Sequence, residues 1–252
     1  MSYAPATELP PHSHESSSVT LVLSGGGHDI VDGIRYEFAP LTALIKPRAC
    51  VHSSLVAASG FSAICFELPP AVLRRVESRT TLFARCRWVM DPRLTTRLLG
   101  LYVLLRSGEP VDLSRVTAWA EDIAAVGSAT PDSSIARRCP RTCDAEAVIA
   151  ERFRGPLRVG EIAEELGLHP VYLTRVSRRS TGASIGERIA RRRVSWLAGR
   201  LAGTRRSVAS LALGAGFADH AHACRVFRKQ TGLSPTAYRA LAGAAATSLS
   251  PT

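Results

Sequence analysis

Apolar residues recur at helical spacing through much of the C-terminal part of this 252-residue chain. Their spacing predicts a helix, a glycine turn and a second helix at residues 162–182, and the same arrangement again at residues 211–232. The second helices share a ten-residue run, 175–184 and 225–234, in which seven positions are identical or exchange Arg for Lys. A repeat at a fixed offset of 50 residues indicates one supersecondary unit that is used twice.

Two helices joined by a glycine-containing turn form the helix-turn-helix unit, whose second helix can enter the major groove of DNA. Between the two copies, apolar residues on a helical rhythm predict a connecting helix within residues 183–201. A helix of about 20 residues spans about 30 Å, close to the ~34 Å between successive major-groove faces of B-DNA. The connecting helix is therefore long enough to hold two recognition helices one turn apart on DNA, although many helices have this length.

The N-terminal half has the pattern of strands followed by helices. Short β-rich runs between residues 19 and 68, separated by Gly and Pro, predict a small antiparallel barrel or sandwich. Residues 1–18 are polar and proline-rich and are expected to form a flexible arm, whereas apolar stripes predict helices within residues 69–128. These stripes favour a helical dimer interface, with packing inside the chain as the alternative. Residues 129–143, which contain Ser and Pro, are the expected linker.

Positive charge is concentrated in the half that contains the repeat. The chain carries a net charge of +11, and residues 141–252 hold 18 Arg and Lys against 8 Asp and Glu. Residues 1–140 hold 14 against 13. An excess on one half indicates a surface that binds the phosphates of a nucleic acid, and the alternative is an ordinary solvated basic face.

The second copy of the repeat contains a specific combination of residues: Ala209, Leu211, Ala212, Ala215, Gly216, Phe217, Ala218, Asp219, Arg225, Val226, Phe227, Arg228, Lys229, Gly232, Leu233, Ser234, Pro235, Tyr238 and Arg239. With these residues, the stretch 144–241 resembles the tandem helix-turn-helix domain of the AraC/XylS family of bacterial transcription regulators. Two core positions depart from the family pattern, with Ser177 in place of a Phe and Ala223 in place of a larger apolar residue. A weaker similarity, carried by residues 23–25, Pro47 and His52, relates residues 12–68 to cupin barrels.

The resemblance implies an α+β fold. It places a cupin-like β-barrel with flanking helices in residues 1–128, a linker in 129–143 and an all-α domain with two helix-turn-helix motifs joined by a long helix in 144–241. Residues 242–252 are expected to be a disordered tail. The implied function is that of a sequence-specific regulator, which inserts two recognition helices into successive major grooves and responds to a small-molecule effector in the N-terminal domain. RNA polymerase is an expected partner, and a homodimer is expected.

The same resemblance assigns roles to individual residues of the two recognition helices. Arg175 and Arg225 are suited to bidentate hydrogen bonds with guanine, and Val171 to a thymine methyl group. The full set expected to read bases is Val171, Thr174, Arg175, His220, Ala221, His222 and Arg225. The set expected to bind phosphates, which fix position without reading sequence, is Arg178, Arg179, Arg191, Arg192, Arg228 and Lys229.

Three histidines, His12, His14 and His52, are the candidates for binding a metal ion or an effector. Imidazole nitrogens in this number suit a divalent cation. However, no carboxylate lies three or four residues after His14, and Ala49 stands where a metal-binding cupin has Gly. We therefore expect no cofactor and favour a pocket without metal, with a barrel that serves only for dimerisation as a further alternative. The six cysteines are expected to be thiols.

Other functional classes find little support in the sequence. A metal-dependent cupin enzyme with a DNA-binding appendage rests on the three histidines alone, because the chain has no nucleophile–base set, nucleotide-binding glycine loop or paired acids. We therefore expect that the protein is not an enzyme. A ligand-independent or architectural DNA-binding protein is the remaining alternative. The sequence has no run of about 18 apolar residues, so no membrane span is predicted. The N-terminus lacks a signal-like pattern, and a cytoplasmic protein is therefore expected.

Overall fold

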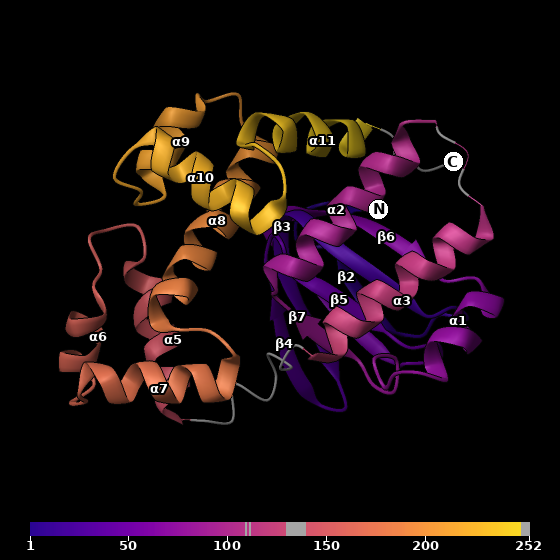
Figure 1. Ribbon diagram of the computed structural model, residues 1–252, viewed down its shortest axis with the longest axis horizontal. Helices are drawn as coiled ribbons and strands as arrows, with labels where there is room; N and C mark the ends of the chain where they lie inside the picture. Colours follow the sequence, from indigo (N-terminus) through magenta and orange to yellow (C-terminus); the bar gives the residue numbers. More distant parts are fainter. Residues whose placement is uncertain (109, 111, 130–139, 248–252) are drawn as a thin grey trace.

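The computed structural model describes residues 1–108, 110, 112–129 and 140–247. An antiparallel sheet with covering helices forms the N-terminal half, and helices alone form the C-terminal half (Figure 1). The strands are β1 Ser2–Tyr3, β2 Glu8–His12, β3 Ser18–Val31, β4 Ile34–Phe38, β5 Ala43–Lys46, β6 His52–Glu67 and β7 Arg87–Val89. The helices are α1 Pro70–Glu77, α2 Pro92–Arg106, α3 Leu113–Ala129, α5 Pro140–Arg152, α6 Val159–Glu165, α7 Pro170–Thr181, α8 Ile185–Gly203, α9 Val208–Gly214, α10 His220–Thr231 and α11 Pro235–Thr247.

The sheet is built on the long pair β3 and β6. The strand order is β1-β6-β3-β5-β7, with β2 also paired to β6 and β4 to β3. The first part of β3 pairs with β5 and the end of β6, and its last part pairs with β4 and the start of β6. Between these parts the register shifts, and both Gly25 and Gly60 have a positive φ of 73°. A Cβ on Gly25 would lie 1.9 Å from the carbonyl oxygen of Gly60, so this bend requires glycine.

Several sequence expectations for the N-terminal half are corrected. Residues 1–18 are not a free arm, because β1 and β2 both pair with β6. The region 69–128, expected to be helical, also contributes the strand β7, which pairs with β5. Among the described strands the pairing forms an open, bent sheet, whereas a barrel was expected for residues 19–68.

A disulfide joins Cys50 to Cys86, so the expectation that all six cysteines are thiols is wrong for this pair. The pairing of β7 with β5 explains their proximity, because Cys86 directly precedes β7 and Cys50 lies shortly after β5. Cys65 and Cys224 are free thiols.

The two faces of β3 have different neighbours. Val19, Leu21 and Leu23 belong to a core that also includes buried residues of α2, α3, α8, α10 and α11. Ser18 and Thr20, which alternate with them, line a cavity on the other side. The period of two along a strand produces this division. One strand therefore lies between the helical layer and a pocket.

The long helix α8 takes part in two cores. Ile185 and Ile189, near its start, pack with residues of α5, α6 and α7. Val194, Leu197 and Leu201, further along, belong to the larger core that contains β3. The expected connecting helix is thus confirmed, and it is also the element on which the C-terminal half meets the sheet (Figure 1).

Hydrogen bonds fix this contact between the two halves. The Tyr238 hydroxyl, in α11, donates to the carbonyl oxygen of Leu23 at 2.8 Å. The Ser195 hydroxyl, in α8, donates to the carbonyl oxygen of Pro40 at 2.8 Å. A Cβ on Gly199, one turn further along α8, would lie 2.9 Å from the Pro40 ring, so a small residue is needed there. The second helix-turn-helix module is consequently packed against the N-terminal half.

The expected domain boundaries need adjustment at two places. Residues 242–247 are part of α11, and Ala242 and Ala245 are buried, so the tail expected at 242–252 does not begin at residue 242. Of the expected linker 129–143, Ala129 ends α3 and residues 140–143 open α5. Residues 130–139 and 248–252 lie outside the described part of the chain. Among the described helices, none has the length and apolar character needed to cross a bilayer.

Replacement of Tyr238 by Phe is expected to destabilise the protein. Tyr238 is fully buried, so the change leaves the carbonyl of Leu23 without this donor, at a cost of about 1–3 kcal/mol. Urea unfolding of the full chain measures the loss. Tyr172→Phe, at a tyrosine that is 41% exposed, is the control and should change the free energy of unfolding by less than about 0.5 kcal/mol. Equal effects of the two changes would contradict the role given to the buried hydroxyl.

Candidate nucleic-acid interface and N-terminal pocket

The first recognition helix, α7, has clear start and stop signals. Pro170 occupies its first turn, where a missing backbone N–H is tolerated, and Gly182 ends it with a positive φ of 70°. Leu173 and Ser177, one helical turn apart, are fully buried and fix the inner face of the helix. The other face is therefore open to solvent.

The second recognition helix, α10, repeats this construction. The Asp219 carboxylate accepts a hydrogen bond from the backbone N–H of His222 at 2.6 Å and so caps the start of the helix. This bond lowers the pKa of Asp219, so the cap is ionised at neutral pH. Ala223 and Phe227 are buried, and Gly232 ends the helix with a φ of 75°.

A threonine before each terminal glycine holds the turn that follows. The Thr181 hydroxyl donates to the carbonyl of Ser177 at 2.8 Å and accepts from the backbone N–H of Ala183 at 3.3 Å. The Thr231 hydroxyl donates to the carbonyl of Phe227 at 2.9 Å and accepts from the backbone N–H of Leu233 at 3.2 Å. In each copy the threonine of the repeated Thr-Gly pair thus stabilises the C-terminal end of the recognition helix, a role that the sequence repeat alone did not reveal.

Ser177 and Phe227 occupy equivalent positions, and both are fully buried. The Ser177 hydroxyl donates to the carbonyl of Ala183 at 2.7 Å. At this position a hydrogen bond of the Ser177 hydroxyl therefore fixes the end of α7, whereas packing of the Phe227 ring fixes the end of α10.

Most of the predicted base-reading residues lie on the open faces. Arg175, His220, Ala221 and Arg225 are exposed, Val171 is 68% exposed, and Thr174 and His222 are half-buried. The His222 ring packs edge-on against Phe217, with ring centres 5.5 Å apart.

Tyr172 is a candidate contact residue that the sequence reasoning missed. It is 41% exposed, and the Arg175 guanidinium lies 5.8 Å from the centre of its ring. An aromatic ring over a guanidinium restrains the orientation of the cation. The offset of 50 residues could have indicated Tyr172, because it corresponds to His222 in the second copy.

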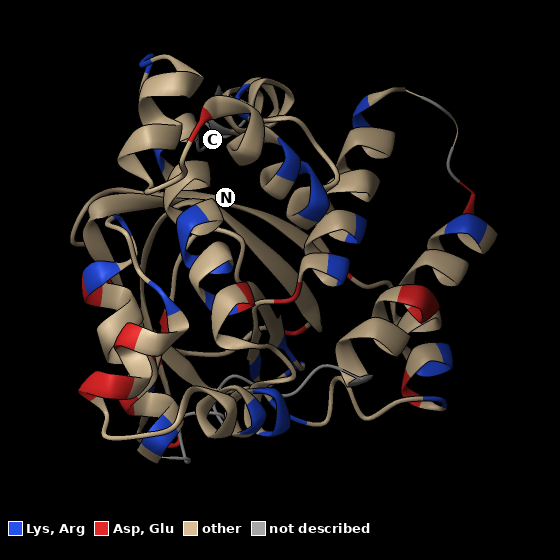
Figure 2. Ribbon diagram, turned by 60° about the vertical axis from the view of Figure 1, so that its left-hand side comes forward, with Lys and Arg blue, Asp and Glu red and all other residues tan. Residues whose placement is uncertain are grey.

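The predicted phosphate-binding residues divide into two groups. Four of them lie exposed on the last turns of α7 and α10, namely Arg178, Arg179, Arg228 and Lys229. In contrast, Arg191 donates to the carbonyl of Met90 at 3.0 Å, and the Arg192 guanidinium lies 5.8 Å from the centre of the Phe153 ring. Arg191 is thus directed at the N-terminal half, which corrects its expected role. Basic residues lie mainly on the helices and are rare on the strands (Figure 2).

A joint between the two modules fixes their relative position. Arg193 donates to the carbonyls of Phe153 at 2.8 Å and Gly155 at 2.9 Å. Arg154 donates to the carbonyl of Gly214 at 2.9 Å and lies 5.1 Å from the centre of the Trp196 ring. Because α8 contributes Arg193 and Trp196, the helix connects the modules through side chains as well as along the backbone.

Comparison with known proteins identifies the family. A family model described as a helix-turn-helix domain matches residues 162–241. The regulatory protein SoxS of Escherichia coli K12 is 32% identical over 96 residues, which cover 38% of this chain and 90% of SoxS. This chain belongs to the AraC/XylS family of transcription regulators. It is accordingly a DNA-binding regulator of the helix-turn-helix type.

One further relative and one solved structure are also similar to this chain. The Msm operon regulatory protein of Streptococcus mutans is 32% identical over 92 residues, or 36% of this chain and 33% of that protein. The structure of ToxT from Vibrio cholerae covers 96% of this regulator and 97% of ToxT, with 12% identity and a TM-score of 0.41.

The N-terminal half of the regulator contains a cavity of about 90 Å³. One water needs about 10–15 Å³ by this measure, so the cavity has room for a ligand of several heavy atoms. It is lined by apolar residues, such as Leu44, Val56 and Phe61, and by polar ones. The polar groups include a buried ion pair, in which the Lys46 ammonium lies 3.0 Å from the Asp29 carboxylate. Burial lowers the pKa of Lys46, and the charge of Asp29 opposes this effect.

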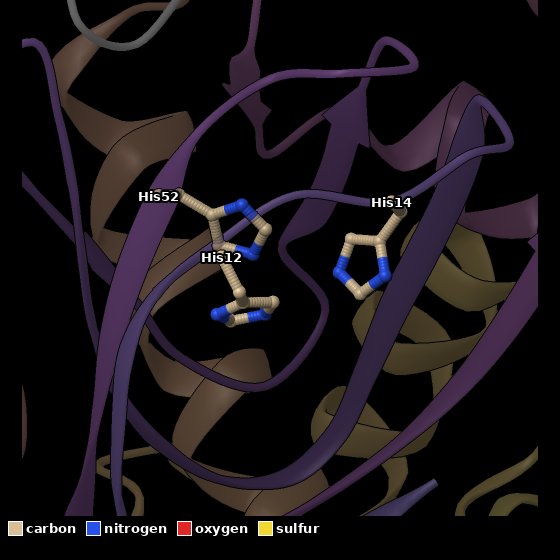
Figure 3. A group of neighbouring side chains, drawn as sticks. All are labelled: His12, His14 and His52. Carbon is tan, nitrogen blue, oxygen red and sulfur yellow. The ribbon is translucent and has the colours of Figure 1, made fainter.

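His12, His14 and His52 meet at this cavity (Figure 3). The ring centre of His12 lies 4.3 Å from that of His52 and 5.1 Å from that of His14. Burial lowers the pKa of His52 to about 4, and the nearby charge of Lys46 contributes. The pKa of His14 is also lowered, mainly by burial and then by His12. Both rings are therefore neutral at physiological pH.

Replacement of Ser177 by Ala is expected to weaken the first module. The change removes a fully buried hydroxyl that bonds to Ala183, at a cost of about 1–3 kcal/mol in the free energy of unfolding. Ser180→Ala in the same helix is the matched control and should be nearly neutral, because the half-buried Ser180 hydroxyl bonds back to carbonyls of its own helix, those of Val176 at 2.8 Å and Ser177 at 3.4 Å. Chemical denaturation of the full chain compares them. A larger loss from Ser180→Ala would show that the buried bond has been misread.

Proposed function

We propose that the regulator recognises a specific double-stranded DNA site by placing α7 and α10 in successive major grooves. Bases are read by the predicted set together with Tyr172. Phosphates are bound by the exposed arginines and the lysine at the ends of the same helices. The N-terminal cavity receives a small-molecule effector, which changes how the second module is held.

The observation that carries this proposal is the matched construction of α7 and α10 at the two ends of α8. Both helices bury one face, leave the opposite face open and end in basic turns. The 19 residues of α8 span about 28 Å, which is of the order of one turn of B-DNA.

The two faces of β3 have different neighbours, and this arrangement supports a role for the cavity in binding an effector. Thr20 lines the cavity, and Leu21 and Leu23 on the opposite face pack in the core that contains α8, α10 and α11. Tyr238 of α11 is bonded to the backbone of Leu23. A ligand that displaces β3 therefore displaces the surface on which the second module rests, because close-packed cores transmit strain.

Selection of bound sequences from a random DNA pool by the 252-residue chain tests the proposed DNA site. The expected result is a motif with two parts whose centres lie roughly 10 base pairs apart, one helical turn of DNA. Equal affinity for all sequences at fixed salt would contradict sequence-specific binding and would indicate an architectural role.

Replacement of Arg225 by Ala is expected to cost about 1–3 kcal/mol of binding free energy on the selected site and to relax the preference at one base pair. Arg225 is exposed on the open face of α10, where it can reach a base edge. Fluorescence anisotropy with the selected site and its single-base variants measures both effects. Arg74→Ala on α1, which removes an exposed arginine of the N-terminal half, should leave binding unchanged. An unaltered sequence preference would remove Arg225 from the reading set.

Replacement of Arg228 by Ala is expected to weaken binding to all DNA sequences alike. The side chain is exposed on the last turn of α10, and loss of one phosphate contact reduces the slope of log K against log salt by about 1. Titrations at several salt concentrations give this slope. Arg191→Ala should leave the slope unchanged, because Arg191 is bonded to Met90. A loss confined to the selected site would assign Arg228 to base reading instead.

A further inference from the structure

The three histidines of the N-terminal cavity are brought together by backbone pairing. His12 and His52 are direct partners in the register of β2 and β6. The carbonyl of His14 accepts a hydrogen bond from the backbone N–H of Ala49 at 2.8 Å, in the turn that precedes His52. Each imidazole is therefore attached to a backbone segment that is fixed relative to the other two.

Hydrogen bonds also orient two of the rings. The Nδ1 atom of His12 lies 2.8 Å from the carbonyl oxygen of Pro10, and Nδ1 of His52 lies 3.1 Å from that of Cys50. A carbonyl oxygen can only accept, so the proton of each ring is on Nδ1. In the neutral ring this leaves the lone pair on Nε2, available to a ligand. Histidines that bind metals in proteins are held in this way by their second nitrogen.

We propose that His12, His14 and His52 bind one divalent transition-metal ion, in contrast to the pocket without metal that the sequence favours, because the structure brings the three rings together. One nitrogen from each ring lies within 4.8 Å of those of the other two. Around a tetrahedral ion with bonds of about 2.0–2.1 Å the nitrogens would be roughly 3.3 Å apart. Small side-chain rotations close this difference, because the backbone positions are already set.

The chemistry of the donors indicates the class of metal. Three imidazole ligands suit zinc, copper, iron or nickel, whereas calcium and magnesium prefer oxygen ligands. The cluster contains no carboxylate, although Glu67 lines the same cavity. Lys46 is the cation that opposes binding, and its contact with Asp29 at 3.0 Å offsets its charge.

A three-histidine site leaves a fourth coordination position for water or a small ligand. The site borders the cavity that Thr20 of β3 also lines. The metal would therefore act, alone or with a bound ligand, where the proposed effector acts. Only this regulatory consequence rests on the proposed function, because the site itself is independent of DNA binding.

Titration of the 252-residue chain with metal tests the site. The protein is prepared without a polyhistidine tag, stripped of metal by a chelator and titrated with zinc chloride in a calorimeter. We expect one zinc ion per chain, and we expect cobalt(II) to produce the visible absorption of a tetrahedral complex. His14→Ala and His52→Asn should each weaken zinc binding by at least tenfold. His14 is exposed, so its replacement leaves the fold intact even if that of the buried His52 does not.

His28→Asn is the matched control, because His28 lies on β3 outside the cluster. It should bind zinc like the unchanged protein. Substoichiometric binding, or equal binding by the His14→Ala variant, would overturn the proposal. No DNA is present in the titration, so failure of the metal site is distinguishable from failure of the proposed DNA recognition, which the random-pool selection measures separately.

Discussion

The burial of α8 on the sheet is the constraint on which the arrangement of this regulator depends. The first turns of the helix complete the core of the first module through Ile185 and Ile189, and its later turns join the core that contains β3. Ser195 and Gly199 allow close approach to Pro40, which bulky side chains would prevent. Because a close-packed interior has few voids in which to absorb movement, α8 fixes the spacing of the two DNA-binding modules and also the place of one of them on the sheet.

The two modules are consequently unequal, although their sequences repeat. The first has a core of its own, made by α5, α6, α7 and the start of α8. The second shares its core with α2 and the sheet, and Tyr238 adds a buried hydrogen bond to Leu23. Arg193 and Arg154 then tie the modules to each other through backbone carbonyls. Within the described part of the chain, a change in the N-terminal half would therefore reach the second module through direct packing, and it would reach the first module through α8 and these hydrogen bonds.

Local signals in the sequence were sufficient for the recognition helices and insufficient for the sheet. Asp219 and Gly232 act within a few residues of their own position, so capping rules predict the limits of α10 correctly. The bend at Gly25 depends on Gly60 across the sheet, and the Cys50–Cys86 disulfide depends on the pairing of β5 with β7. Such pairings between distant residues have no signature in either segment alone. For the same reason the three histidines could be noted in the sequence, whereas their convergence required the register of β2 and β6.

The excess of positive charge illustrates the same limit. It indicated the DNA-binding half correctly, but it did not show which arginines face outward. Arg191, Arg193 and Arg154 donate to backbone carbonyls of neighbouring segments, and a guanidinium with five donors is well suited to this use. The basic residues of this half therefore form two groups: one group bonds to backbone carbonyls of neighbouring segments, and the other remains exposed on the surface. Part of the surface charge lies on the last turns of α7 and α10, where a cation is also stabilised by the negative end of the helix dipole.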